Sequence, residues 1–119
     1  MQRSGVDKMK HIKVETSGDS LYLINNEIHA MVDNREYVFM IDSVEKLVIL
    51  TTDVGPFYDD MGLAIDVGNN TAIFIMSEHR CYKKFLFDEI AKVLPIDYQK
   101  IIEASTCIDN KVFEIYKKK

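Results

Sequence analysis

Cysteine is scarce in this chain, and its two thiols, Cys81 and Cys107, lie far apart in the sequence. That spacing excludes a C-x-x-C redox or zinc motif, and two thiols do not make a disulfide framework. Basic residues are also few, since 15 Lys and Arg face 19 Asp and Glu, for a net charge of −4. A duplex nucleic-acid binder needs a concentrated basic surface, so nucleic acid is not an expected partner.

Long apolar runs are missing as well. Stretches such as Leu47–Leu50 and Ala72–Met76 are far shorter than the roughly 20 residues that span a bilayer, and the N-terminus has no apolar targeting segment. We therefore expect a cytoplasmic protein that makes no membrane contact. With 119 residues, 47% of them hydrophobic, the chain suits one domain. We expect residues 1–8 to be a flexible lead-in or an expression remnant, and residues 9–119 to form a single α+β domain.

Short apolar segments alternate with turn residues, which predicts an antiparallel β-meander. Asp33-Asn34 tolerates left-handed backbone and predicts a hairpin turn, as does Gly68-Asn69-Asn70. The segment Lys46–Thr52 is β-branched without polar alternation, which favours a strand covered on both sides. The other expected strands are His11–Glu15, Leu21–Ile24, Glu27–Val32, Tyr37–Ile41, Gly62–Val67 and Thr71–Met76.

At Ser77 the hydrophobic period changes from two to nearly four, which predicts one long helix that begins at a Ser77 N-cap and ends at Pro95. Its apolar face would comprise Tyr82, Phe85, Leu86, Ile90, Val93 and Leu94. Asp97 then predicts the cap of a short second helix, Tyr98–Ser105. The last segment, Val112–Tyr116, is typical of a strand that lies at a sheet edge or extends it.

No residue pattern predicts catalysis, a metal or a cofactor. His79 and Cys81 are the closest pair of soft ligands, but on a helix they lie about 200° apart and cannot easily share an ion. A serine elbow, a Walker loop and a dinucleotide fingerprint are all absent from the sequence. Nucleophiles cluster at 105–107, where a base such as His29 would have to approach through the fold.

The segment Thr51–Asp60, TTDVGPFYDD, stands apart because it combines a Gly-Pro turn, two aromatic residues and three carboxylates. One interpretation is a wide loop whose side chains satisfy its own amides. The other is a partner-binding loop, in which the aromatic residues supply contact area and the carboxylates match a basic surface. The candidate binding residues are Thr52, Asp53, Gly55, Pro56, Phe57, Tyr58, Asp59 and Asp60.

TTDVGPFYDD, LPIDYQKIIEAS and DNKVFEIY resemble an uncharacterised family of small bacterial proteins that share a TTDxGPFxDD segment. The resemblance covers Thr51–Tyr116 and implies no catalytic residue; Pro95-Ile96 departs from the family pattern. More loosely, the meander followed by a helix resembles a pleckstrin-homology-like half-barrel. The basic loop that holds phosphoinositides in lipid-binding members is missing here, because the early turn is Asn25-Asn26-Glu27. The resemblance therefore implies no lipid binding.

These patterns favour a non-enzymatic protein-interaction module, such as an adaptor or an immunity protein that neutralises a toxin, with a basic protein as partner. The first alternative is a small hydrolase-like enzyme that uses Asp53, Asp59 or Asp60 with a histidine brought close by the fold. The second is a homodimeric structural protein joined through the terminal strand Val112–Tyr116, because exposed strand edges readily pair.

Overall fold

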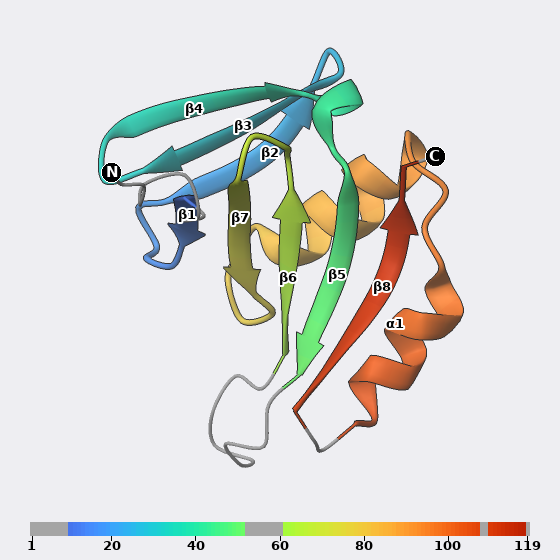
Figure 1. Ribbon diagram of the computed structural model, residues 1–119. Coiled ribbons are helices and arrows are strands. Elements are labelled where there is room, and N and C mark those ends of the chain that lie inside the picture. Colours follow the sequence, from blue (N-terminus) through green and yellow to red (C-terminus); the bar gives the residue numbers. More distant parts are fainter. Residues whose placement is uncertain (1–9, 52–60, 108–109, 119) are drawn as a thin grey trace, which may run out of the picture.

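The computed structural model describes residues 10–51, 61–107 and 110–118, and it shows the expected α+β class (Figure 1). Eight strands form a five-stranded sheet of order β1-β7-β6-β5-β8 and a three-stranded sheet of order β2-β3-β4. The strands are β1 Lys10–Val14, β2 Ser20–Ile24, β3 Glu27–Val32, β4 Arg35–Met40, β5 Lys46–Thr51, β6 Met61–Asp66, β7 Thr71–Met76 and β8 Lys111–Lys117.

The predicted hairpins are confirmed. Strands β2, β3 and β4 are antiparallel neighbours, as are β5, β6 and β7. Asp33 and Asn34 adopt φ of 53° and 65° in the turn between β3 and β4, while Gly68 and the two asparagines after it also have positive φ. Glycine and asparagine tolerate this left-handed backbone best, so these residue types set the turns.

The expected simple meander is wrong for the first strand. β1 pairs in parallel with β7, with Lys10 opposite Thr71 and Val14 opposite Ile75. The chain leaves β1 through a turn in which the amide of Asp19 donates to the carbonyl of Thr16, 3.0 Å away. That turn carries β2 into the other sheet, so the two neighbours in sequence do not pair.

The expected long helix is also corrected. The Ser77 amide donates to the carbonyl of Met61, which continues the β7 ladder, so Ser77 does not cap a helix. The helical region begins at Tyr82, and most of it is the π-helix η3, Lys84–Glu89, followed by the 3₁₀ turn η4, Ile90–Lys92. In a π turn residues five apart share a face. Phe85 and Ile90 are accordingly both fully buried.

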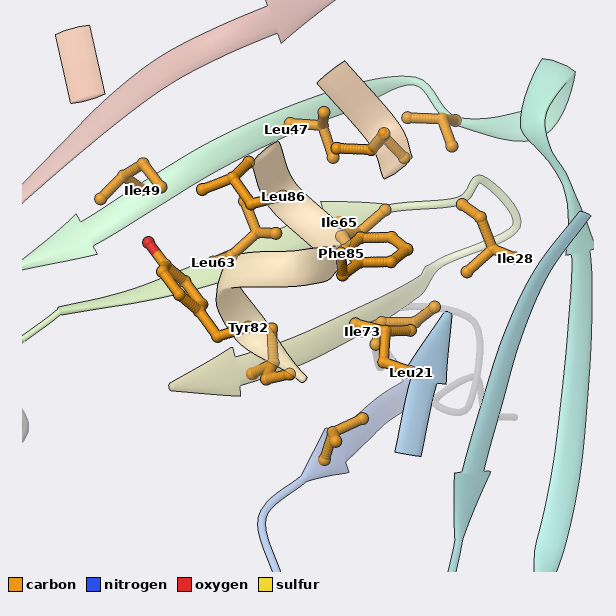
Figure 2. Close-up of a cluster of buried hydrophobic side chains, with 14 of the residues drawn as sticks. Leu21, Ile28, Leu47, Ile49, Leu63, Ile65, Ile73, Tyr82, Phe85 and Leu86 are labelled. Atoms are coloured by element: carbon orange, nitrogen blue, oxygen red, sulfur yellow. The ribbon is translucent and has the colours of Figure 1, made fainter. Parts of the chain in front are cut away.

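The core lies where η3 packs between the inner faces of the two sheets. Figure 2 shows Phe85 and Leu86 of η3 beside Leu63 and Ile65 of β6 and near Ile28 of the three-stranded sheet. All five side chains are fully buried. One helix thus joins both sheets into a single apolar cluster, and the opposite face of each sheet points outward.

Strand β5 is covered on one side, not on both as predicted. Leu47 and Ile49 are fully buried, whereas Val48 and Leu50 point to the outer side and are half-buried. In Figure 1, η3 and α1 lie behind the five-stranded sheet or beyond its β8 edge, and neither of them covers its front. None of the described helices is long and apolar enough to cross a membrane.

The predictions for the second helix and for the last strand are confirmed. Helix α1 is Tyr98–Ser105, and the Asp97 carboxylate caps it by accepting from the Lys100 amide at 3.3 Å. Strand β8 pairs with β5 and forms the end of its sheet. The amide of Asp97 donates to the carbonyl of Ile115 at 2.9 Å, so the chain before α1 lies along the outer edge of β8.

Candidate functional site

The predicted binding loop meets the described structure at Thr51. This residue is 4% exposed, and its hydroxyl accepts from the Lys111 amide at 3.1 Å. Thr51 therefore fixes the end of β5 to the start of β8. The remaining candidates lie outside the described residues: Thr52, Asp53, Gly55, Pro56, Phe57, Tyr58, Asp59 and Asp60.

His79 and Cys81 belong to a set of hydrogen bonds that holds the β1–β2 turn. The Cys81 amide donates to Nδ1 of His79 at 3.1 Å, so the ring proton sits on Nε2 and is donated to the carbonyl of Thr16 at 2.8 Å. Arg80 adds a bond from Nη2 to the carbonyl of Asp19 at 2.9 Å. These contacts clamp the β1–β2 turn. Within the described ranges no three His, Cys, Asp or Glu side chains are grouped to hold a metal ion.

Two hydroxyls of the nucleophile cluster at 105–107 bond to backbone carbonyls of α1 in the described structure. Ser105 donates its hydroxyl proton to the carbonyl of Ile102 at 2.7 Å, and Thr106 donates to that of Glu103 at 3.1 Å. His29 lies on β3 in the other sheet, where its ring faces two glutamates. The hydroxyls of Ser105 and Thr106 therefore satisfy backbone carbonyls in the last turn of α1.

A polar hollow of about 520 Å³ opens between β1 and the β3–β4 hairpin. Its wall carries Lys13 and Arg35 together with Glu15 and Asp33, and Asp19 lies among them. Both carboxylate oxygens of Asp19 accept backbone amides. The charges of the wall are mixed and its most buried acid is already bonded, which makes this hollow a poor catalytic pocket.

The best candidate surface is the outer side of the three-stranded sheet, which we call the three-stranded face. The strand register places Tyr22, His29 and Val38 in one row, with parallel rows on either side. Its large apolar members are exposed: Tyr22 by 38%, Val38 by 47%, Met40 by 51% and Ile24 by 52%. The face consists of Ser20, Tyr22, Ile24, Glu27, His29, Met31, Glu36, Val38 and Met40.

His29 occupies the middle of this face and is fixed on three sides. Its ring stacks on Tyr22 with centroids 5.0 Å apart and planes within 1°. Nδ1 lies 3.2 Å from Oε2 of Glu36, and Nε2 lies 3.4 Å from Oε1 of Glu27. The His29 side chain is only 16% exposed. The carboxylates thus flank a rigid aromatic pair, and such an arrangement presents contact area at little entropic cost.

The charge of the three-stranded face has one sign. Its nine outward positions include two carboxylates and neither lysine nor arginine. Sequence reasoning missed this surface because it arises from register: Glu27 and Glu36 meet His29 only through strand pairing. In the sequence, the alternation of Glu27, His29 and Met31 was the signal that could have revealed this surface.

No protein-family model, curated protein or solved structure matches the chain.

Proposed function

We propose that the protein is a non-enzymatic interaction module that binds a basic protein partner through the three-stranded face. One observation carries the proposal: four large apolar side chains are between 38% and 52% exposed around two carboxylates, with neither lysine nor arginine among the outward positions of these strands. Water contact at such a cluster is unfavourable, and a partner that covers it would remove apolar area from solvent.

The two kinds of side chain would contribute differently. Tyr22 supplies a rigid aromatic contact and Met40 an adaptable one, and both residue types are enriched in the centres of interfaces. Glu27 and Glu36 select against acidic partners and speed the approach of basic ones. A cytoplasmic adaptor or an immunity protein that neutralises a basic toxin would use such a surface.

Two further parts of the proposal concern the type of fold and the segment Thr51–Asp60. A helix enclosed by two sheets supports a pleckstrin-homology-like arrangement, although β1 joins β7 in parallel. The segment Thr51–Asp60, which motivated the resemblance to a bacterial family, remains a second proposed contact. Its aromatic and acidic composition is of the same kind as that of the three-stranded face, so both would suit a basic partner.

The experiment is affinity capture from extract of the source cells with tagged baits, analysed by quantitative mass spectrometry. Tyr22→Ser with Val38→Ser removes apolar area, and Glu27→Lys with Glu36→Lys reverses the charge. The matched control is Val93→Ser with Ile102→Ser, which changes two exposed apolar residues of the helical side. We expect a basic protein that the wild type and the control retain and that both face variants lose at least tenfold.

Salt dependence provides the second readout. Binding carried partly by the two glutamates must weaken as ionic strength rises, because salt screens exposed charges. Equal capture by wild-type protein and both face variants, each shown to be folded by circular dichroism, would overturn the assignment of this face. Phe57→Ala with Asp59→Ala tests the loop separately, since loss of the same protein by that variant alone would place the contact at Thr51–Asp60.

A further inference from the structure

The outer side of the five-stranded sheet is a second, different surface, which we call the five-stranded face. Figure 1 shows this side in front of β7, β6, β5 and β8, with η3 on the opposite side of the sheet. Residues Ile101 and Ala104 of α1 belong to the core on the inner side. The face consists of His11, Lys13, Lys46, Val48, Leu50, Gly62, Ala64, Asp66, Ala72, Phe74, Met76, Val112, Glu114 and Lys117.

The centre of this face is apolar and hollowed. Ala64 and Ala72 are small, and the larger Val48, Leu50 and Phe74 stand around them. Together they line a hollow of about 220 Å³, with a lysine and an aspartate at one end. A molecule that covers this face would remove the apolar lining of the hollow from water.

In the central row of the face, two opposite charges lie on either side of the middle strand, β6. The register runs from Glu114 to Val48, to Ala64, to Phe74 and to Lys13, one residue from each of the five strands. An acid thus lies on one outer strand and a base on the other, in the same row. Lys13 and Glu114 are both exposed.

We propose that a second copy of this chain covers the five-stranded face, in a dimer whose two-fold axis runs along β6 between the stacked sheets. A two-fold interface brings the same patch of both copies together. Rotation about this axis exchanges the two outer strands. Glu114 of each copy then lies opposite Lys13 of the other, which forms two equivalent ion pairs.

The same rotation matches the apolar rows. Phe74 of one copy lies over Val48 of the other, and Met76 lies over Leu50, while Ala64 faces its own copy at the axis. Sheets that pack face to face stand about 10 Å apart with strands about 30° from parallel. Alanine at the axis permits this approach, and the long Lys13 side chain tolerates the rotation.

The charges also explain why the two sheets would take different partners. Self-pairing of the three-stranded face would bring together four carboxylates with no lysine or arginine from its outward positions. In the five-stranded face the central row instead pairs acid with base, and the two Asp66 carboxylates that meet at the axis each have a Lys46 on the neighbouring strand. The proposal is therefore independent of the proposed function: dimer formation and capture of a basic protein involve different sheets, and either can fail alone.

The expected size and edge contacts distinguish this dimer from one joined through β8. The face spans five strands about 4.8 Å apart and three rows of residues about 6.8 Å apart. Counted on both copies, an interface of these dimensions buries roughly 1,000 Å², which predicts a weak, concentration-dependent dimer. Pairing of β8 edges is disfavoured, because the Ile115 carbonyl accepts from the Asp97 amide and that part of the edge is occupied.

The test is sedimentation equilibrium from about 10 µM to 1 mM, where a weak interface shows its concentration dependence. Lys13→Glu and Glu114→Lys should each weaken the wild-type dimer at least fivefold, since each creates two like-charge contacts. Their equimolar mixture should form heterodimers, because the carboxylate introduced at position 13 of one chain then meets the ammonium introduced at position 114 of the other, while the native pair remains on the opposite side. The double variant should dimerise like wild type.

The control is Lys83→Glu with Glu103→Lys, which exchanges charges on the exposed helical side and should leave dimerisation unchanged. A wild type that is monomeric at about 1 mM overturns the proposal. So does a dimer that neither single variant weakens, or a mixture that forms no heterodimer. Circular dichroism of each variant must first show that it is folded, so that a mixture without heterodimers counts against the interface.

Discussion

One carboxylate oxygen of Asp19 lies 2.9 Å from the backbone amide of Thr16, which donates a hydrogen bond to it. The same oxygen accepts from Glu15, and the other accepts from Asp33 at 3.4 Å. The Thr16 bond is the largest cause that lowers the pKa of Asp19 from 3.8, with burial opposing it. One side chain thus ties the turn after β1 to the β3–β4 hairpin.

Asp19→Asn should therefore destabilise the fold and flatten its acid dependence. Because the folded state lowers this pKa, the charged carboxylate stabilises fully above pH 3.8, and its contribution is lost as the pH falls through the folded value. At neutral pH we expect a loss of about 1–3 kcal/mol in the free energy of unfolding. Urea denaturation at several pH values measures both effects. The exposed Asp88→Asn is the control, and parallel acid profiles for Asp19→Asn and wild type would contradict the prediction.

Glu89 closes the outer edge of β2, because its Oε1 accepts from the Leu23 amide at 3.0 Å. Glu89→Ala leaves that amide without this acceptor, so we expect about 1 kcal/mol of destabilisation. Amide hydrogen exchange at Leu23 should accelerate more than at other β2 positions. Glu89→Gln keeps a carbonyl oxygen and is the matched control. Equal exchange rates in the alanine and glutamine variants would show that the contact does not protect the edge.

Phe85 and Phe87 lie on the same helical segment but differ in burial, at 0% and 38% exposed. Phe85→Ala removes the side chain that packs between the two sheets, and we expect a cost of about 3–5 kcal/mol. Phe87→Ala should change stability by about 0.5 kcal/mol or less, as is usual for surface positions. Thermal and urea unfolding measure both variants. A similar cost at the two positions would mean that η3 is not the shared core element.

Local sequence signals predicted the elements that local chemistry determines. Asp33-Asn34 set a hairpin through left-handed backbone, and Asp97 set the start of α1 through its carboxylate. The parallel pairing of Lys10 with Thr71 could not be read from periodicity, since β1 has the same alternation whichever strand it joins. The π-helix was missed for a related reason: Phe85, Leu86 and Ile90 also fit one face of an ordinary helix.

The candidate sites also divide into one that local sequence reveals and others that depend on long-range strand pairing. The segment Thr51–Asp60 was noticed because its residue types are unusual together, and only Thr51 falls within the described structure. The two sheet faces were not noticed, because each depends on which residues become cross-strand neighbours. Glu114 and Lys13 are about a hundred positions apart in the sequence, yet the register places them in one row. Surfaces built by long-range pairing are invisible to local pattern analysis.

Gly62 tests how closely the five-stranded face is packed. A Cβ at this position would lie 2.8 Å from Sδ of Met76 and 3.2 Å from the carbonyl of Ile75, so Gly62→Ala should cost about 1–3 kcal/mol. Met76→Ala removes the clash with the flexible methionine side chain but leaves the close contact with the carbonyl of Ile75. The double variant should therefore recover part of the loss, and the two substitutions should be non-additive in a double-mutant cycle measured by urea unfolding. Gly18→Ala is the control, since its Cβ would meet nothing closer than 3.8 Å. Additive effects of Gly62→Ala and Met76→Ala would show that the methionine does not lie over the glycine, whereas partial recovery locates the contact on the outer side of β6 and β7.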